Sequence, residues 1–380
     1  MEKNRIKLAI LESKYYGAVT SVNDLVVRLD KERFDVTFLY LSGDPGRENH
    51  LQQAGYKVCY LSRSERMPVF RPDVLVKLIR FLRRNQIDLL HCHAHKATQY
   101  GAIAGIFAPK VKIIAHVHGL GRFERLRRKL AFLLFAWRIN RFLAVAKAVK
   151  QDILQSNWRI PASKIEVLEN SVDYERFASA KISKSQARQM LNIPQKAFVF
   201  GTIGRLAPMK GQQYMIEAMA LIKNDMPNSH LLIIGDGPLR QVLQEQVHKS
   251  RLEERVHFTG KRADVEKCIQ AMDAFVLSSV ASEGMPRALL EAMAGGIPPI
   301  VTDLSGMAEM IDKSDLGFVV KPGDSHAVAN AMIQMMRKSP QEITAMAEMG
   351  EKKVREQYSH TVVMEKLKNI YLEIVGIMDQ

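Results

Sequence analysis

Cysteine and long apolar runs are both scarce in this sequence. Its 380 residues include three cysteines, Cys59, Cys92 and Cys268, and no two of them form a C-x-x-C pair. This spacing argues against a disulfide framework or a zinc knuckle and favours a reducing compartment. No uncharged apolar run approaches the roughly 20 residues that span a bilayer, and Met1–Arg5 leads directly into a predicted strand. We therefore expect no signal peptide, no transmembrane helix and a cytoplasmic location.

Acidic residues are scarce in the first half of the chain. Residues 1–180 hold 31 Lys and Arg against 17 Asp and Glu, a net charge of +14, whereas residues 181–380 hold 24 against 23, a net charge of +1. A basic half of this kind is typical of a protein that meets a polyanion or a membrane surface. A basic surface that only confers solubility is the alternative.

The segment Gly121–Arg141 joins a basic stretch to an apolar one. Five cations precede five aromatic or aliphatic side chains: Arg122, Arg125, Arg127, Arg128 and Lys129, then Phe132, Leu133, Leu134, Phe135 and Trp137. Such a segment suits an interfacial helix on anionic lipid at the inner face of the cell membrane, and a core-packed helix with a basic start fits equally well. Nucleic acid is not expected as a partner, because the segment lacks any recognised binding module.

Predicted strands and helices alternate along most of the chain. Strands are predicted at Lys7–Glu12, Asp35–Leu41, Lys57–Leu61, Asp88–His93, Val111–His118, Arg141–Ala146, Lys164–Glu169, Ala197–Ile203, Leu231–Ile234, Val256–Gly260, Ala274–Leu277 and Pro299–Thr302. This alternation predicts an α/β protein with parallel, doubly wound sheets. A length of 380 residues suits two domains.

Residues 281–303 read as a strand-to-helix turn, a helix and a second strand. Pro286 suits the first helical position, and Gly295-Gly296 end the helix. Glu283 lies in the turn and Glu291 about two helical turns further on. The helix N-terminus offers free N–H groups to an anion, while a loop carboxylate can bind sugar hydroxyls. A capping acid and a solvated helical glutamate are the alternative.

A second strand-to-helix loop, residues 204–211, carries two cations. Arg205 and Lys210 follow the strand Ala197–Ile203 and precede a helix from about Gln212. A departing nucleoside diphosphate develops negative charge, which two cations and a helix N-terminus can stabilise without a metal ion. A generic basic loop is the alternative.

Histidines gather where two predicted strands end. The motif His91-Cys92-His93-Ala94-His95 would place three imidazoles on one face if the strand continued, which favours a metal site. The strand is predicted to end within the motif, which would break this alternation. A metal-dependent hydrolase using His91, His93 and His95 therefore remains an alternative function. His118, directly before Gly119, ends the next strand, where a neutral imidazole can donate or accept a hydrogen bond.

The 281–303 stretch resembles the signature of a known enzyme family. Glu283 and Glu291, seven residues apart within S-E-G-M-P-R-A-L-L-E-A-M-A-G-G-I-P, resemble the signature of the retaining GT-B glycosyltransferases, family 4 in particular. The loop G-R-L-A-P-M-K-G and the tetrapeptide Asn170–Asp173 are similar to further family motifs, with Ser171 where glycine is usual. The resemblance implies two Rossmann-like domains facing a cleft: residues 1–173 for the acceptor, 174–360 for the nucleotide-sugar donor, and a helix at 361–380 that packs back on the first domain.

The resemblance also implies a role for each site residue. Arg205 and Lys210 would hold the donor diphosphate, Glu291 the ribose hydroxyls, and Glu283 and His118 the donor sugar. Further donor contacts would come from three loops and the helix: Gly17, Lys261, Arg262, Gly284, Met285, Pro286, Arg287 and Leu290. The family usually has two adjacent glycines in the first loop, where this chain has Gly17 and Ala18.

The predicted activity is retaining transfer of a sugar from a nucleotide-sugar, with UDP expected from the family's habits, to a hydroxyl of a cell-envelope glycan or lipid-linked acceptor such as lipopolysaccharide core. No metal cofactor is expected, because no Asp-x-Asp motif lies in a suitable loop. A nucleotide-sugar-binding protein without catalysis is a further alternative. The sugar, the acceptor and the oligomeric state are left open.

Overall fold

Two compact units make up the protein, each built around one parallel sheet. The structure, a computed structural model, describes residues 5–15, 21–46, 49–64, 70–121, 134–156, 160–180, 182–281, 283–311 and 315–377. Unit 1 comprises Met1–Glu169 and Thr361–Gln380, and unit 2 comprises Asn170–His360. The expected α/β class with two Rossmann-like units is confirmed.

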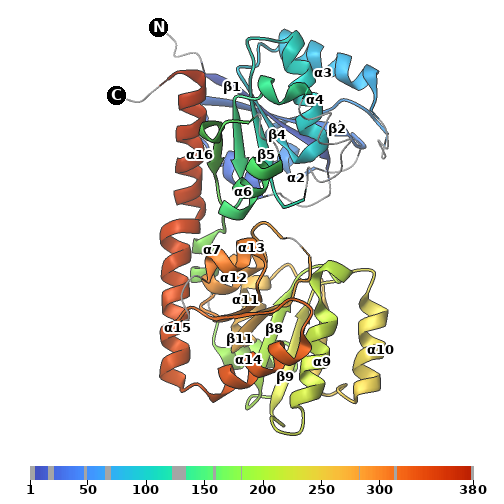
Figure 1. The fold of residues 1–380 in the computed structure, drawn as a ribbon, viewed down its shortest axis with the longest axis vertical. Coiled ribbons are helices and arrows are strands. Elements are labelled where there is room, and N and C mark those ends of the chain that lie inside the picture. Colours follow the sequence, from blue (N-terminus) through green and yellow to red (C-terminus); the bar gives the residue numbers. More distant parts are fainter. Residues whose placement is uncertain are drawn as a thin grey trace. The chain divides into compact units, whose positions relative to one another are not determined.

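Unit 1 has, among its described residues, a seven-stranded sheet of order β3-β2-β1-β4-β5-β6-β7 (Figure 1). Its strands are β1 (Ile6–Lys14), β2 (Phe34–Ser42), β3 (Lys57–Tyr60), β4 (Leu89–His93), β5 (Lys112–Val117), β6 (Arg141–Ala144) and β7 (Ile165–Val167). Its helices are α1 (Ser21–Val26), α2 (His50–Gln53), α3 (Pro72–Arg84), α4 (Ala94–Phe107), α6 (Lys147–Ser156) and α16 (His360–Val375), with short 3-10 turns η1 (Ala136–Arg138) and η2 (Ala162–Lys164).

Unit 2 has, in the part that the structure describes, a six-stranded sheet of order β10-β9-β8-β11-β12-β13. Its strands are β8 (Phe198–Ile203), β9 (Ser229–Ile234), β10 (Val256–Gly260), β11 (Ala274–Leu277), β12 (Pro299–Thr302) and β13 (Phe318–Val320). Its helices are α7 (Tyr174–Ser179), α8 (Lys184–Met190), α9 (Gln212–Ile222), α10 (Arg240–Ser250), α11 (Val265–Cys268), α12 (Arg287–Ala294), α13 (Ser305–Met310), α14 (Ser325–Arg337) and α15 (Pro340–Lys353). Short turns η3 (Pro208–Lys210) and η4 (Ile269–Ala271) and a π-helical turn η5 (Val354–Tyr358) complete it.

The central strands are short apolar runs because helices cover both faces of each sheet. All six residues of β9 are buried, as are all four of β11 and of β12. A strand buried on both faces loses the alternation of apolar and polar residues that a half-exposed strand shows. In unit 2, Ser339 and Glu342 form a capping box at the start of α15, where Pro340 occupies the first turn.

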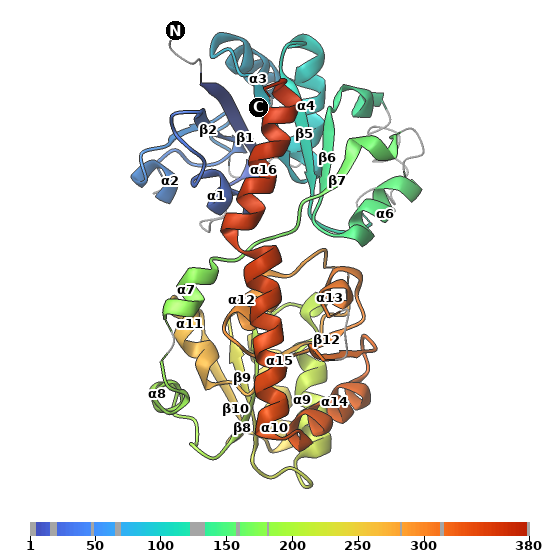
Figure 2. The same ribbon diagram turned by 90° about the vertical axis from the view of Figure 1, so that its left-hand side faces the viewer.

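The last helix, α16, completes the core of unit 1. Its residues Leu367, Ile370 and Tyr371 are buried in one cluster with Ile10 of β1 and Ile114 of β5. Figures 1 and 2 show α16 on the face of the sheet opposite α3 and α4. The crossing back of the C-terminal helix onto the first domain is thus confirmed.

The chain passes between the units at Glu169 and Asn170, four residues before the expected boundary after Asp173. Val172 forms a parallel bridge with Ser359, and both residues belong to unit 2. This pairing assigns Asn170–Asp173 to unit 2.

Of the segment Gly121–Arg141, residues 122–133 lie outside the described part of the chain. Among the described helices, none combines the length and the apolar character needed to cross a bilayer.

We predict that unit 1 depends on α16 for its stability. Leu367 is completely buried, so Leu367→Ala should lower the free energy of unfolding by about 2–5 kcal/mol, the range for deleting a buried leucine side chain. Both tryptophans, Trp137 and Trp158, lie in unit 1, so tryptophan fluorescence during urea unfolding reports on this unit. Ile377→Ala is the control, because Ile377 is 44% exposed and should change little. Equal unfolding midpoints for wild type and Leu367→Ala would contradict the prediction.

Candidate active site

A buried ion pair lies where β8 and β11 of unit 2 end. These strands are neighbours in the sheet, so the loops after them meet at its carboxyl edge. Lys210 Nζ lies 2.7 Å from Oε1 and 2.8 Å from Oε2 of Glu283. Ser279 Oγ donates a hydrogen bond of 2.5 Å to Oε1 of the same carboxylate. The Lys210 side chain is 20% exposed and the Glu283 side chain is 9% exposed, so this pair is largely shielded from water.

Backbone contacts between the two loops hold this pair in place. Ser278 Oγ donates to the Gly211 carbonyl at 2.8 Å, and the Val280 amide donates to the Met209 carbonyl at 2.9 Å. Gly211 has a left-handed φ of 64°, and a Cβ there would overlap the Ser278 carbonyl oxygen. Lys210 therefore has its position set by both strands.

The turn that carries Glu283 is packed tightly from two sides. A Cβ on Gly306, in the first turn of α13, would overlap the Gly284 carbonyl oxygen. From the other side, Asn170 Nδ2 donates to the Met285 carbonyl at 2.6 Å. This contact joins the Asn170–Asp173 motif to the Glu283 signature within unit 2.

The structure places the rest of the signature around this turn. Gly284, Met285, Pro286 and Leu290 are buried, while Arg287 and Glu291 are half-buried on α12. The helix begins at Arg287, so Pro286 is its N-cap residue, one position earlier than expected.

The remaining predicted cations differ in how they are paired. Arg205 is exposed, and within the described residues no carboxylate pairs with its guanidinium; its carbonyl accepts from Gln212 Nε2 at 3.0 Å. Lys261 is also exposed. Arg262, in contrast, donates to both carboxylate oxygens of Asp264, at 2.8 and 2.7 Å. The Arg262 side chain is thus already occupied, whereas Arg205 is open to an anion. Gly17, a predicted donor contact, lies outside the described residues.

In unit 1, four imidazoles meet at the carboxyl ends of β4 and β5. His91 and His93 lie on β4, and the sheet register pairs His93 with His116 of β5. These three side chains are 0–5% exposed. His93 Nδ1 lies 3.1 Å from Nε2 of the half-buried His118, and His91 Nδ1 lies 2.6 Å from the hydroxyl of Tyr371 on α16.

Burial keeps this cluster uncharged. Loss of solvation lowers the pKa of His91, His93 and His116 well below the usual value, and repulsion between the rings lowers each pKa further. The Leu168 backbone raises the pKa of His116 by a smaller amount than burial lowers it, and among the described residues neither His116 ring nitrogen has a partner with hydrogen-bond geometry. All three imidazoles are therefore neutral near pH 7.

His95 is not part of this cluster. The strand β4 ends at His93 and α4 begins at Ala94, so the alternation that would align His95 stops one residue too early. The three described residues whose ligand atoms lie within 4.8 Å of one another are His91, His93 and His116. The trio His91, His93 and His95 expected for a hydrolase is thus not what the fold assembles. The sequence has a histidine pair at the end of each of two consecutive strands, His91 and His93 in the first and His116 and His118 in the second. This repetition could have identified His116.

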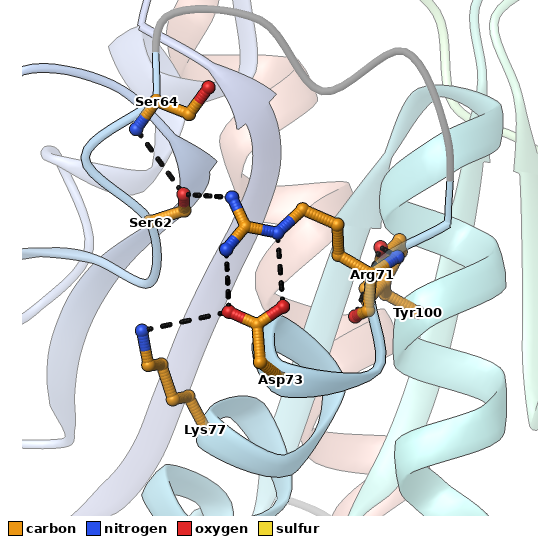
Figure 3. A network of polar contacts seen from close by, with 6 residues as sticks. All are labelled: Ser62, Ser64, Arg71, Asp73, Lys77 and Tyr100. Atoms are coloured by element: carbon orange, nitrogen blue, oxygen red, sulfur yellow. Dashed lines mark hydrogen bonds and ion pairs between the residues drawn. The ribbon is translucent and has the colours of Figure 1, made fainter.

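A charged network near the end of β3 is a structural feature. Arg71 donates to the two oxygens of Asp73 at 3.0 and 2.7 Å and to Ser62 Oγ at 3.0 Å, and its amide donates to the Tyr100 hydroxyl at 2.6 Å (Figure 3). The Arg71 guanidinium lowers the pKa of the Asp73 carboxyl below its usual value. Because these charges satisfy one another, we assign the network to fixing the start of α3.

Comparison with known proteins decides the family. Residues 183–353 match the sequence model described as Glycosyl transferases group 1, and residues 15–176 match the one described as Glycosyltransferase Family 4. The chain belongs to glycosyltransferase family 4. This result supports the transferase over the hydrolase alternative.

This glycosyltransferase is similar to named proteins from several organisms. It is 29% identical over 311 residues, 79% of each chain, to the UDP-Gal:alpha-D-GlcNAc-diphosphoundecaprenol alpha-1,3-galactosyltransferase of Escherichia coli. It is 24% identical over 358 residues, 90% of this chain and 91% of the relative, to the capsular polysaccharide biosynthesis glycosyltransferase CapM of Staphylococcus aureus. The crystal structure of Anabaena HepE in complex with UDP shares the fold, with a TM-score of 0.83, 22% identity, and coverage of 97% of this chain and 100% of that chain.

We predict that the Glu283 turn of this glycosyltransferase requires glycine at position 306. Gly306→Ala should displace the turn, because the new methyl group would overlap the Gly284 carbonyl, and should lower the stability of unit 2 by about 1–3 kcal/mol. Hydrogen-exchange mass spectrometry should show faster exchange in peptides covering residues 283–290. Gly350→Ala is the matched control, since its nearest neighbour atom would lie at 3.6 Å, an ordinary contact. Unchanged exchange in Gly306→Ala would refute the requirement.

Proposed function

We propose that this glycosyltransferase moves a sugar from a UDP-sugar to a hydroxyl of a lipid-linked or other cell-envelope saccharide, with retention of the anomeric configuration. The observation that carries the proposal is the buried Lys210–Glu283 pair, with the exposed Arg205 on the same loop as Lys210 and paired with no carboxylate among the described residues. Two names support the choice of substrates: the Escherichia coli relative is named for transfer from UDP-Gal to a diphosphoundecaprenol-linked sugar, and HepE is described in complex with UDP.

The leaving diphosphate is assigned to Arg205, Lys210 and the N-terminus of α12. Departure of UDP leaves negative charge on the diphosphate, and cations held in advance stabilise that charge without reorganising in the transition state. Lys210 is held in advance by Glu283, and Arg205 is an exposed guanidinium whose planar fork suits phosphate oxygens. These groups perform the role that a metal ion has elsewhere, so we propose that the transfer is metal-independent.

The donor sugar is assigned to Glu283, and His118 is proposed as a further contact with it. The Glu283 carboxylate accepts from Lys210 and Ser279, and a carboxylate has further lone pairs to accept sugar hydroxyls. Glu291 is proposed to hold the ribose hydroxyls. The backbone near Lys261 and Arg262 is proposed for the base, which agrees with the Arg262 side chain being bound to Asp264. Gly17, Gly284, Met285, Pro286, Arg287 and Leu290 complete the proposed donor contacts.

Retention is proposed to proceed by attack from the face that the diphosphate leaves. Glu283 is the buried carboxylate at this site, and its two oxygens already bind the Lys210 ammonium and the Ser279 hydroxyl. A carboxylate neutralised in this way is a poor nucleophile. We therefore assign it to holding the sugar. We propose that the bond between the sugar and UDP breaks first, and that the acceptor hydroxyl then bonds to the sugar cation within the ion pair and gives its proton to an oxygen of the departing diphosphate.

We also propose that unit 1 contacts anionic lipid at a membrane surface, where a lipid-linked acceptor would be found. The basic first half supports this, and so do exposed apolar side chains next to the basic segment: Leu134 is 67% exposed and Trp137 is 66% exposed. Arg138 is excluded as a lipid-binding cation because its guanidinium donates to the carbonyls of Gly105 and Val111. An exposed tryptophan beside cations is typical of an interfacial anchor.

We predict that Lys210→Ala lowers kcat/KM for transfer by about 30- to 1,000-fold, corresponding to about 2–4 kcal/mol of lost transition-state stabilisation. UDP release from UDP-sugars, with and without saccharide acceptors, measures it. Lys249→Ala is the control. Lys249 is an exposed cation on α10 of the same unit, so its replacement should leave the rate unchanged.

Glu283→Ala should also reduce transfer, and full activity of that variant would exclude the site assignment. UDP binding by the wild type without any turnover would favour the non-catalytic alternative.

For the membrane contact, we predict flotation of the protein with liposomes that contain anionic lipid and none with purely neutral liposomes. Trp137→Ser should weaken flotation by removing the interfacial aromatic side chain, and added salt should weaken it by screening the cations. Val242→Ser, an exposed apolar residue on α10 of unit 2, is the matched control and should float like wild type. Absence of flotation with both kinds of liposome would defeat this part of the proposal.

A further inference from the structure

We propose that unit 1 binds a divalent transition-metal ion of the zinc class through His91, His93 and His116. The three side chains are buried, and their ligand atoms all lie within 4.8 Å of one another. Three imidazoles suit Zn²⁺, Co²⁺, Ni²⁺ or Cu²⁺, whereas Mg²⁺ and Ca²⁺ prefer oxygen ligands. The proposal concerns unit 1 alone and does not depend on the proposed transfer reaction.

Open ring nitrogens are the first observation that supports an ion. Nε2 of His91, Nε2 of His93 and both ring nitrogens of His116 are buried and have no hydrogen-bond partner among the described residues. Buried polar atoms in native proteins are nearly always satisfied by protein, water or an ion. These four atoms lie in one cluster, and an interaction of His116 with the Leu168 backbone occupies at most one of them, so each of the three rings keeps a nitrogen available to an ion.

The second observation is that the other ring nitrogen, Nδ1, already has a partner in both His91 and His93. The Tyr371 hydroxyl contacts Nδ1 of His91, and the His118 imidazole contacts Nδ1 of His93. Histidines that bind a metal through one nitrogen usually donate the other N–H to a fixed partner, which sets the tautomer and the ring orientation. With Nε2 facing the ion, His91 would donate to Tyr371 and His93 would donate to His118.

The sheet supplies the third observation, a rigid mount for the ligands. Residues two apart on β4 face the same side, and the register places His116 of β5 directly beside His93. The same face is covered by α16, which contributes Tyr371. Zinc–nitrogen bonds of 2.0–2.1 Å place tetrahedral nitrogens about 3.4 Å apart, so ion binding would draw the rings together. A water molecule would complete the four ligands.

The ion would therefore tie together β4, β5 and, through Tyr371, the C-terminal helix. All of these belong to unit 1, whereas Arg205, Lys210 and Glu283 belong to unit 2. The proposed role is structural, and its signature is metal-dependent stability of unit 1.

Metal content tests the proposal directly. The protein, purified through a tag without histidine, is equilibrated with Zn²⁺ or Co²⁺, freed of loose ions by gel filtration, and analysed by inductively coupled plasma mass spectrometry. We expect about one ion per chain for wild type, as three imidazoles and one water make one site. His116→Gln should lose the ion. His95→Gln is the matched control and should keep it, because His95 lies on α4 outside the cluster.

Two spectroscopic measurements keep the test decisive if His116→Gln fails to fold. Bound Co²⁺ should give the intense visible ligand-field bands of a four-coordinate site in wild type, which needs no variant. Zn²⁺ should also raise the unfolding midpoint of unit 1 in wild type, followed by tryptophan fluorescence, and His93→Gln should abolish this shift. Wild-type protein that retains neither ion would overturn the proposal and assign the cluster to buried water. Full metal retention by a folded His116→Gln would overturn the ligand assignment.

Discussion

The ion pair between Lys210 and Glu283 is the interaction on which the candidate active site depends. The two residues are 73 positions apart and come from different strand–loop–helix elements. A buried ion pair contributes little net stability, because the desolvation of both charges offsets their attraction. Its value here is geometric. The adjacency of β8 and β11 and the hydrogen bonds between their loops hold a cation and a carboxylate in direct contact before any ligand binds.

Strand order explains what the sequence could and could not reveal about this site. Lys210 and Glu283 were identified separately, because each follows a buried strand and such loops meet at one edge of a parallel sheet. Their direct contact depends on β11 lying next to β8, and the order of strands is a tertiary property that no local pattern contains. Ser279 was missed for a related reason. A single serine after an apolar strand has no distinguishing spacing, although its hydroxyl is what holds the Glu283 carboxylate from the second side.

The histidine cluster shows the same limit in unit 1. The two-residue period identified His91 and His93 correctly as sharing a face, but that period holds only while the strand is extended. At Ala94 the backbone takes a φ of 65°, an unfavourable conformation for a residue with a side chain, and α4 begins. The third imidazole comes instead from the neighbouring strand, through the register that pairs His93 with His116. The fold class was predictable from alternating elements, while the composition of each cluster required the pairing of strands.

The same cluster also determines how α16 can dock. Leu367, Ile370 and the other apolar residues of α16 are buried in the core of unit 1, and apolar contacts of this kind have little directional preference. The hydrogen bond between Tyr371 and His91 forms in one register only, and a slip would leave a hydroxyl and an imidazole nitrogen buried without partners. This polar contact spans 280 residues of sequence, so it helps to select the position of the last helix on the sheet. Because His93, adjacent in the cluster, holds His118, the register of α16 and the orientation of the proposed sugar-binding imidazole are set by one group of side chains.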